Sequence, residues 1–319
     1  MLGAVAGTGR MQYDGGHKRL SIKCLTIGRC LPAIHGGEPC SVDSLHHGRV
    51  QEWITMTQLR IALVQMNIEA GNTEANFAKM ERKLEEAVAL DPKPDLIVLP
   101  EMWNTGYALT EIRKLADPDG ERTKKLVSGF CRRHGVNVLA GSIAQLRGEG
   151  VTNTIHAFDR TGANIAEYSK IHLFQLMNEH LHLEAGEAAG SFELEGVPAA
   201  AMICYDIRFP ELARKLALGG AKLLIVPAEW PHPRLHHWRT LLQARAIENQ
   251  MFVVSCNTVG ESGGSSFFGH SMVIDPWGEV VAEAEERETI LVADIDLALV
   301  DEVRGRIPVF ADRRPELYE

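Results

Sequence analysis

Glu101, Lys170 and Cys204 are polar residues that each follow directly on an apolar or strand-like run of the chain. Ligands of an α/β sheet lie at the carboxyl ends of its strands, so three such ends can converge in one pocket. Taken singly, each residue also has an ordinary structural explanation: a buried cysteine, a solvated glutamate after a strand, and a lysine that extends to water. Only the three together indicate chemistry.

As a set, the three side chains are suited to acyl transfer. Cys204 begins a helical pattern, where backbone N–H groups and the helix dipole favour a thiolate, which is the nucleophilic form. Glu101 is the candidate base for the thiol proton. Lys170 is the candidate cation for the oxyanion, assisted by a backbone N–H that follows the cysteine. Such a set acts on an amide or a nitrile and requires neither a metal nor an organic cofactor.

Apolar patterning predicts the elements that position these residues. Residues 59–66 form a buried strand pattern, apolar residues at helical spacing follow from 77 to 88, and a second strand pattern at 95–101 ends in Glu101. This is a βαβ unit. Further strands are predicted at 136–141, 152–159, 164–169, 221–226, 251–256, 269–275, 280–284 and 289–295, and further helices at 121–134, 208–218, 235–248 and 297–303. We therefore expect an α/β fold in which two mixed sheets pack face to face with helices outside.

Composition limits the class of protein. The chain of 319 residues carries a net charge of −9, so it has the length of one large α/β domain and lacks the basic surface that nucleic acid requires. No apolar run is long enough to span a membrane. The six cysteines contain no CxxC pair and match no zinc pattern. We interpret them as reduced thiols of a cytoplasmic protein and expect no metal site.

Residues 1–55 differ from the rest of the chain. They are rich in glycine and show no sustained period of 2 or 3.6 residues, and their start lacks the apolar core of a secretory signal. We expect this segment to be a disordered or non-native extension, and residues 56–319 to be the functional domain. Met56, directly before the first strand pattern, is an alternative translation start.

Three ordered motifs carry a family resemblance: Leu99–Glu101, Tyr168–Phe174 and Cys204–Leu212, supported by Arg245–Gln250 and Gly269–Gly278. From Leu59 to about Tyr318 the chain resembles the nitrilase superfamily of carbon–nitrogen hydrolases. The resemblance implies a four-layer α-β-β-α sandwich and a homodimer formed through the helical face beside the cysteine. It also implies a second glutamate near the lysine, which we assign to Glu179, with Glu184 as the competing position.

The segment Lys170–Met177 and the tail Arg306–Pro315 are similar to the ω-amidase branch, which hydrolyses the terminal amide of small 2-oxo acid amides such as 2-oxoglutaramate and 2-oxosuccinamate. Arg208 and Tyr205, beside the nucleophile, are candidate substrate-binding residues, with Arg208 as a clamp for an acidic substrate. An ion pair of Arg208 with Asp206 or Glu211 is the alternative.

Two tryptophans, Trp103 and Trp230, are candidate walls of the pocket or ordinary packing residues. The competing functions are a deaminated-glutathione amidase, a carbamoyl hydrolase, a nitrilase, and a non-catalytic binding protein with this fold.

Overall fold

The computed structural model describes residues 57–318 of the protein. The predicted extension over residues 1–55 lies outside the described residues and stays a prediction. The described part of the chain contains no helix that is both long enough and apolar enough to cross a bilayer.

The first sheet has the order β15-β1-β2-β4-β5-β6, and the short β3 pairs with β4. Its strands are β1 (Gln58–Gln65), β2 (Leu96–Val98), β3 (Asp117–Pro118), β4 (Asn137–Arg147), β5 (Gly150–Phe158), β6 (Asn164–Ser169) and β15 (Thr289–Asp296). The pairs β1–β2 and β2–β4 are parallel, whereas β4–β5, β5–β6 and β1–β15 are antiparallel. The sheet is therefore mixed, as the strand patterns predict.

The second sheet has the order β14-β13-β10-β9-β8-β7 and is also mixed, with β8, β9 and β10 parallel at its centre. Its strands are β7 (Gly190–Leu194), β8 (Val197–Ala201), β9 (Leu223–Ala228), β10 (Phe252–Asn257), β13 (Met272–Ile274) and β14 (Val280–Glu283). A separate hairpin pairs β11 (Val259–Ser262) with β12 (Ser265–Phe268).

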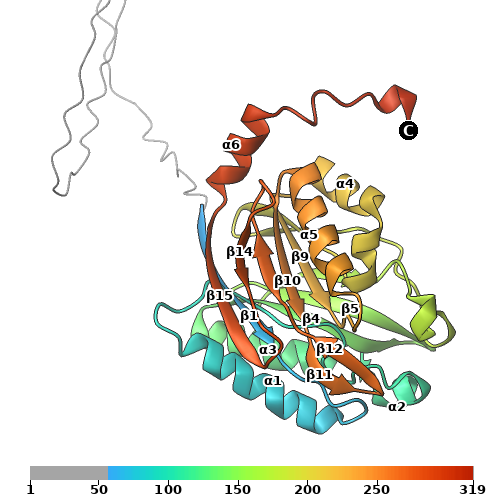
Figure 1. The fold of residues 1–319 in the computed structure, drawn as a ribbon. Coiled ribbons are helices and arrows are strands. Elements are labelled where there is room, and N and C mark those ends of the chain that lie inside the picture. Colours follow the sequence, from blue (N-terminus) through green and yellow to red (C-terminus); the bar gives the residue numbers. More distant parts are fainter. Residues whose placement is uncertain (1–56, 319) are drawn as a thin grey trace, which may run out of the picture. The chain divides into compact units, whose positions relative to one another are not determined.

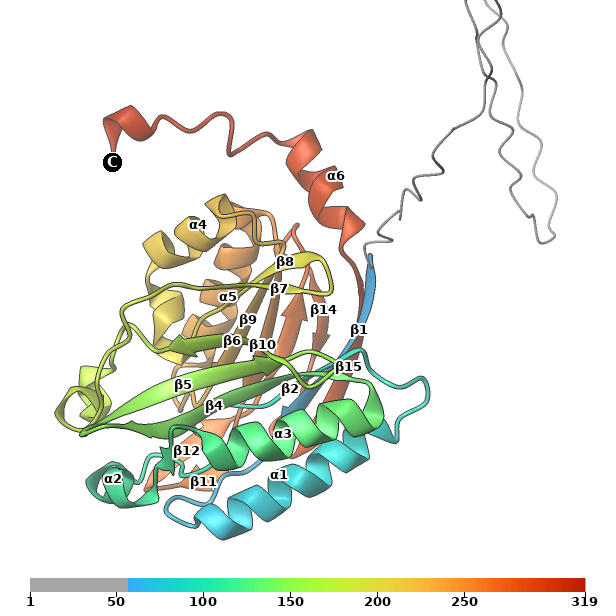
Figure 2. The same cartoon turned by 180° about the vertical axis from the view of Figure 1, so that it is seen from behind.

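Helices α1 (Thr73–Val88) and α3 (Glu121–His134) cover one sheet, and α4 (Pro210–Leu218) and α5 (Leu235–Asn249) cover the other (Figures 1 and 2). The short α2 (Ile112–Leu115) lies beside the β11–β12 hairpin in Figure 1, and α6 (Ala298–Arg306) follows β15. α1 begins where the side chain of Asn72 accepts a hydrogen bond from the Ala75 N–H, which satisfies one of the free donors of the first turn.

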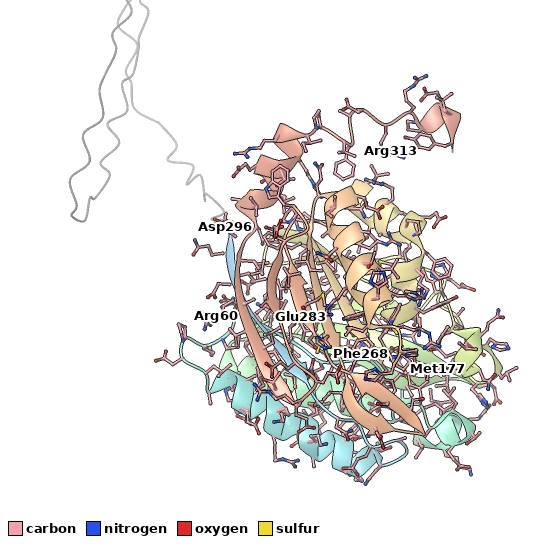
Figure 3. All side chains as sticks on the ribbon, in the orientation of Figure 1. Arg60, Met177, Phe268, Glu283, Asp296 and Arg313 are labelled. Atoms are coloured by element: carbon pink, nitrogen blue, oxygen red, sulfur yellow. The ribbon has the colours of Figure 1, made fainter. Side chains whose placement is uncertain are left out.

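Alternation along β1 shows how the layers are filled. Ile61 and Leu63 belong to the core shared with the second sheet, whereas Ala62 and Val64 pack with the buried residues of α1 and α3. Side chains occupy the space between the layers, as Figure 3 shows with the side chains of the described residues drawn. The fold is a four-layer α-β-β-α sandwich with two mixed sheets, which confirms the predicted fold class.

Candidate active site

The turn that carries Cys204 lies at the carboxyl end of β8. Cys204 begins a 3₁₀ helix, η4 (Cys204–Arg208), and has a φ of 44°, in the left-handed region that non-glycine residues rarely adopt. The Asp206 carboxylate stabilises this turn because it accepts hydrogen bonds from the Ile203 N–H at 2.9 Å and from the Tyr168 hydroxyl at 2.7 Å. A strained backbone that is held by a buried network is typical of functional positions.

The same carboxylate connects the turn to the segment that follows Lys170. Asp206 Oδ1 lies 3.1 Å from the His172 backbone nitrogen, which donates to it, and 2.8 Å from His172 Nδ1. The His172 ring stacks on Phe209 with the ring centres 3.6 Å apart. The segment after Lys170 and the turn that carries Cys204 are therefore fixed relative to each other.

Glu101 follows β2 in a loop that is tied to β4. The Ser142 N–H donates to Pro100 O at 3.1 Å, and Gly141 adopts a φ of +58° directly against this loop. A Cβ on Gly141 would lie 2.0 Å from Pro100 O, so only glycine allows the close approach. Glu101 itself accepts hydrogen bonds from Asn153 Nδ2 at 2.8 Å and from the Glu229 N–H at 2.7 Å.

Lys170 completes a fully buried charged cluster. Its Nζ donates to Glu101 Oε1 at 2.9 Å and to Glu179 Oε1 at 2.7 Å, and all three side chains are inaccessible to solvent. The Tyr107 oxygen lies 3.0 Å from Glu101 Oε1 and 2.6 Å from Glu179 Oε1. Burial alone lowers the pKa of Lys170, but the two carboxylates outweigh it and hold that pKa well above its ordinary value, so the lysine is a cation.

The surroundings of the Cys204 side chain favour the protonated thiol, whereas the start of a helix favours the thiolate. Burial and the charge of Glu101 raise the pKa of Cys204 well above its ordinary value, although Lys170 opposes them. A 3₁₀ helix of one turn supplies too little dipole to compensate for complete desolvation. The negative charge of the Glu101 carboxylate acts on the thiol and contributes to this raised pKa, so Glu101 is the candidate base for the thiol proton.

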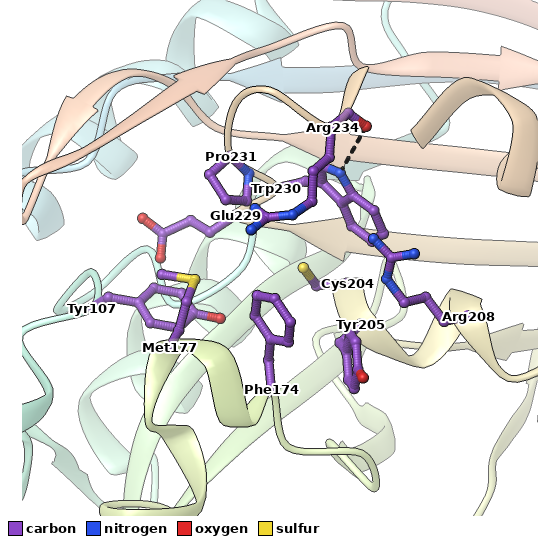
Figure 4. Close-up of a pocket in the computed structure, with 10 residues that line it drawn as sticks. All are labelled: Tyr107, Phe174, Met177, Cys204, Tyr205, Arg208, Glu229, Trp230, Pro231 and Arg234. Atoms are coloured by element: carbon purple, nitrogen blue, oxygen red, sulfur yellow. Dashed lines mark hydrogen bonds between the residues drawn. The ribbon is translucent and has the colours of Figure 1, made fainter. Parts of the chain in front are cut away.

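A pocket opens over Cys204 (Figure 4). Its lining combines aromatic rings with two guanidinium groups and one carboxyl group, and consists of Tyr107, Phe174, Met177, Cys204, Tyr205, Arg208, Glu229, Trp230, Pro231 and Arg234. The Arg208 guanidinium lies 4.6 Å from the centre of the Trp230 ring and 5.9 Å from that of Tyr205. The two guanidinium groups of the lining suit an anionic molecule.

The structure places three of the four predicted substrate-binding residues, Tyr205, Arg208 and Trp230, on this pocket. The interpretation of Trp103 as a pocket wall is wrong: its indole is fully buried, donates to Ala140 O at 2.6 Å and packs edge-on against Phe77. The loop after Glu101 turns this ring toward α1 because the ring fills the core there.

The geometry distinguishes two pairs of alternatives that the sequence leaves open: which glutamate accompanies Lys170, and whether Arg208 forms an ion pair. Glu179 pairs with Lys170, whereas Glu184 is exposed, so the second carboxylate of the cluster is Glu179. Arg208 forms no ion pair with Asp206 or Glu211; its guanidinium lies 3.4 Å from His237 Nδ1 instead. Among residues 57–318, no group of three or more His, Cys, Asp or Glu side chains is placed to hold a metal ion.

Sequence reasoning missed Tyr107, Glu229 and Arg234, which all line the pocket. Glu229 carries the same signal as Glu101 because it directly follows the buried strand β9. Tyr107 and Arg234 lie outside regular strands, in segments whose sequence has no period, and no pattern indicates them.

Comparison with known proteins agrees with this geometry. Residues 60–305 match the carbon-nitrogen hydrolase family. The chain is 48% identical over 258 residues to a 2-oxoglutaramate amidase of Bacillus subtilis, which covers 81% of this chain and 98% of the relative.

Two solved structures share the fold. A CN-hydrolase superfamily protein of Xanthomonas campestris has a TM-score of 0.76 and 32% identity, covering 81% of this chain and 98% of that one. An amidase mutant of Nesterenkonia sp. AN1 carries the acetamide moiety of fluoroacetamide on its active-site cysteine; it has a TM-score of 0.72 and 26% identity, covering 82% of this chain and 95% of that one. The chain belongs to the carbon–nitrogen hydrolase family and is an enzyme that hydrolyses non-peptide C–N bonds.

Proposed function

We propose that this enzyme is an amidase that hydrolyses the terminal amide of a small 2-oxo acid amide, such as 2-oxoglutaramate or 2-oxosuccinamate, to the acid and ammonia. The observation that carries the proposal is the position of Cys204, which lines a small pocket with two arginines and stands in front of a buried glutamate–lysine–glutamate cluster. The 48% identity to a protein named 2-oxoglutaramate amidase supports the choice of substrate.

In the proposed mechanism, Glu101 removes the thiol proton as Cys204 attacks the amide carbon. The raised pKa of the buried thiol means that a free thiolate does not accumulate, so deprotonation is coupled to attack. Lys170 and a backbone N–H after the cysteine stabilise the oxyanion, and Glu179 holds the lysine in place through its 2.7 Å contact. Glu101 then returns the proton to the nitrogen, and ammonia leaves.

The second half of the mechanism releases the acid. Cys204 now carries the acyl group as a thioester, and Glu101 takes a proton from a water molecule that attacks the thioester carbonyl. The C–S bond breaks, and the sulfur takes up a proton to restore the thiol. The acetamide group on the active-site cysteine of the Nesterenkonia amidase supports a covalent route in this family.

The acid end of the substrate requires a cationic partner, which we assign to Arg208. Its guanidinium lies on the pocket beside Cys204 and forms no ion pair with a carboxylate of the described residues, so it is available to a substrate carboxylate. Tyr205 and Trp230 position this guanidinium through the contacts of their rings.

A panel of amides, ureas and nitriles, assayed for ammonia, tests the proposal. We expect 2-oxo acid amides to have the highest kcat/KM. If they are among the poorest substrates, the ω-amidase assignment is wrong; release of carbon dioxide together with ammonia would identify a carbamoyl hydrolase instead.

Assembly and location are further proposals. We propose a homodimer in the cytoplasm, on the basis of the family resemblance and of cysteines that form no zinc pattern. Light scattering of the purified chain tests the proposed homodimer, and a monomer at micromolar concentration would contradict it. Cell fractionation tests the cytoplasmic location.

A further inference from the structure

Glu229 is a buried acid on the pocket that the proposed mechanism does not use. Its backbone N–H donates to Glu101 Oε2, so the residue lies beside the base, and its own side chain lines the pocket above the nucleophile. The residue is only 1% exposed, and neither carboxyl oxygen has a hydrogen-bond partner among the described residues. Buried polar atoms without partners are rare, so a ligand atom is the natural partner.

The surroundings of the Glu229 side chain favour its neutral carboxyl form over the carboxylate. Burial and the charge of Glu101 raise the pKa of Glu229 well above its ordinary value, and the opposing effect of Lys170 is smaller. An unpaired buried carboxylate next to two other carboxylates would be far more costly than a protonated carboxyl group. A neutral carboxyl group carries one O–H, so Glu229 can donate a hydrogen bond to a substrate oxygen.

Arg234 supplies a positive charge on the same pocket. Its side chain extends over the pocket in Figure 4, where Glu229 and Arg208 lie on opposite sides of Cys204. The guanidinium lies over the Phe174 ring at 5.7 Å and pairs with no carboxylate of residues 57–318. The pocket therefore presents one neutral O–H donor and two cations to a bound molecule.

We propose that Glu229 selects the 2-oxo group of the substrate: its carboxyl O–H donates a hydrogen bond to the oxo oxygen, while Arg234 binds the neighbouring carboxylate together with Arg208. This assignment rests on the proposed function, because it takes the acyl group to be a 2-oxo acid. It gives the enzyme a means of distinguishing 2-oxoglutaramate from compounds of the same length with a different group at that carbon.

The groups that glutaramate and glutamine carry in place of the oxo oxygen explain why the enzyme would prefer 2-oxoglutaramate. Glutaramate has two hydrogens in place of the oxo oxygen, so Glu229 would remain unpaired in the complex, a loss that typically costs 10²-fold or more in kcat/KM. Glutamine has an ammonium group there, which a neutral O–H donor does not accept and which two nearby guanidiniums repel. An ionised Glu229 would instead favour glutamine.

Kinetics on this matched pair of substrates tests the proposal. We expect wild-type kcat/KM for 2-oxoglutaramate to exceed that for glutaramate at least ~100-fold. Glu229→Leu removes the donor, and we expect the ratio to fall below ~10. Glu229→Gln keeps an N–H donor and should retain the ratio within about tenfold. Glu187→Leu makes the same change at an exposed acid and should leave the ratio at the wild-type value.

The pH dependence separates a role in recognition from a structural one. In the wild type the ratio of kcat/KM for 2-oxoglutaramate to that for glutaramate should fall as the pH rises through the raised pKa of Glu229, since the ionised form cannot donate a hydrogen bond to the oxo oxygen. Glu229→Gln does not titrate, so its ratio should stay constant over the same range. Thermal unfolding of each variant establishes that it is folded before its kinetics are compared.

The outcomes distinguish a failure of the proposed role of Glu229 from a failure of the proposed function. Suppose that the wild type prefers 2-oxoglutaramate. If Glu229→Leu retains that preference, or if its kcat/KM falls equally for both substrates, the role of Glu229 alone is overturned. A wild type that hydrolyses glutaramate or glutamine as well as 2-oxoglutaramate overturns the oxo selection. A wild type without activity on any 2-oxo acid amide overturns the proposed function, and this inference with it.

Discussion

At the scale of single residues, the site is built on charges that are buried and paired. Glu101, Lys170 and Glu179 form a cluster with two carboxylates around one cation, and Cys204, whose pKa is raised by burial and by Glu101, lies in front of it. The strand-end positions of Glu101, Lys170 and Cys204 could be predicted from the sequence because each directly follows an apolar or strand-like run. Glu179 could be assigned only from the family resemblance, since its 3₁₀ segment has no sequence period. The raised pKa of Cys204 could not be predicted, because it depends on burial that no sequence pattern shows.

Replacing the buried cation tests this cluster. Lys170→Met leaves two carboxylates buried without their counter-ion, so we expect the free energy of unfolding to fall by about 3–5 kcal/mol and ammonia release to be lost. Urea unfolding and the ammonia assay measure the two effects. Lys215→Met, at an exposed position on α4, is the control and should leave both values close to wild type. Full activity in Lys170→Met would contradict the oxyanion role.

The buried acid Glu229 has a consequence for stability. The pKa of Glu229 in the folded state is raised above the ordinary value of 4.5. As the pH rises, the unfolded chain therefore loses this proton before the folded protein does. Stability is therefore greatest below that ordinary value and falls as the pH rises toward the folded pKa, by at most about 1.4 kcal/mol per pH unit.

Glu229→Gln removes this loss of stability at higher pH because the amide does not titrate. We expect the variant to gain free energy of unfolding over wild type as the pH rises from 5 to 8, measured by urea unfolding at intermediate values. A difference between the two proteins that is independent of pH would show that Glu229 is ionised in the folded state.

At the scale of elements, the position of Glu101, the proposed base, depends on the contact between the β2 loop and β4. The pattern of residues 59–101 predicts the βαβ unit correctly, because its strands are continuous apolar runs and its helix has a clear apolar stripe. The β7–β8 hairpin was not predicted, since its strands are short and contain glycine, alanine and proline. The close approach of Gly141 to Pro100 also has no signal in one sequence.

Gly141 and Gly148 form a matched pair for testing this contact. Both have positive φ, but a Cβ on Gly148 meets no atom within 4 Å, whereas one on Gly141 lies 2.0 Å from Pro100 O. We expect Gly148→Ala to cost about 1 kcal/mol of stability and to retain activity. Gly141→Ala should lose at least ~100-fold in kcat, because a shift of about 1 Å in the base is enough for that loss. Equal kinetics of the two variants would contradict the positioning role of Gly141.

At the scale of the whole molecule, the candidate site draws on both sheets of one sandwich. Glu101 and Lys170 follow strands of the first sheet, and Cys204 and Glu229 follow strands of the second. The four-layer fold thus brings four strand ends to one site, in which Cys204 and Glu229 line the pocket and Glu101 and Lys170 lie buried. The sequence predicts the strand ends and the mixed sheets, but not which ends meet, because the packing of two sheets is a property of the whole core.

Removal of the N-terminal segment tests the domain assignment. Every site residue lies between positions 101 and 234, and the family match begins at residue 60. A chain that starts at Met56 should therefore retain kcat/KM within about twofold and unfold at the same temperature. A large loss of activity or of thermal stability would show that residues 1–55 belong to the functional domain.

The central claim is that Cys204 is the nucleophile, and ammonia release by Cys204→Ala tests it most directly. Cys256→Ala, at a buried cysteine in β10 that does not line the pocket, is the matched control and should keep its activity. We predict that folded Cys204→Ala releases ammonia from 2-oxoglutaramate at least ~10⁴-fold more slowly than wild type, down to the uncatalysed background. Turnover at a rate near that of the wild type in this variant would contradict the account.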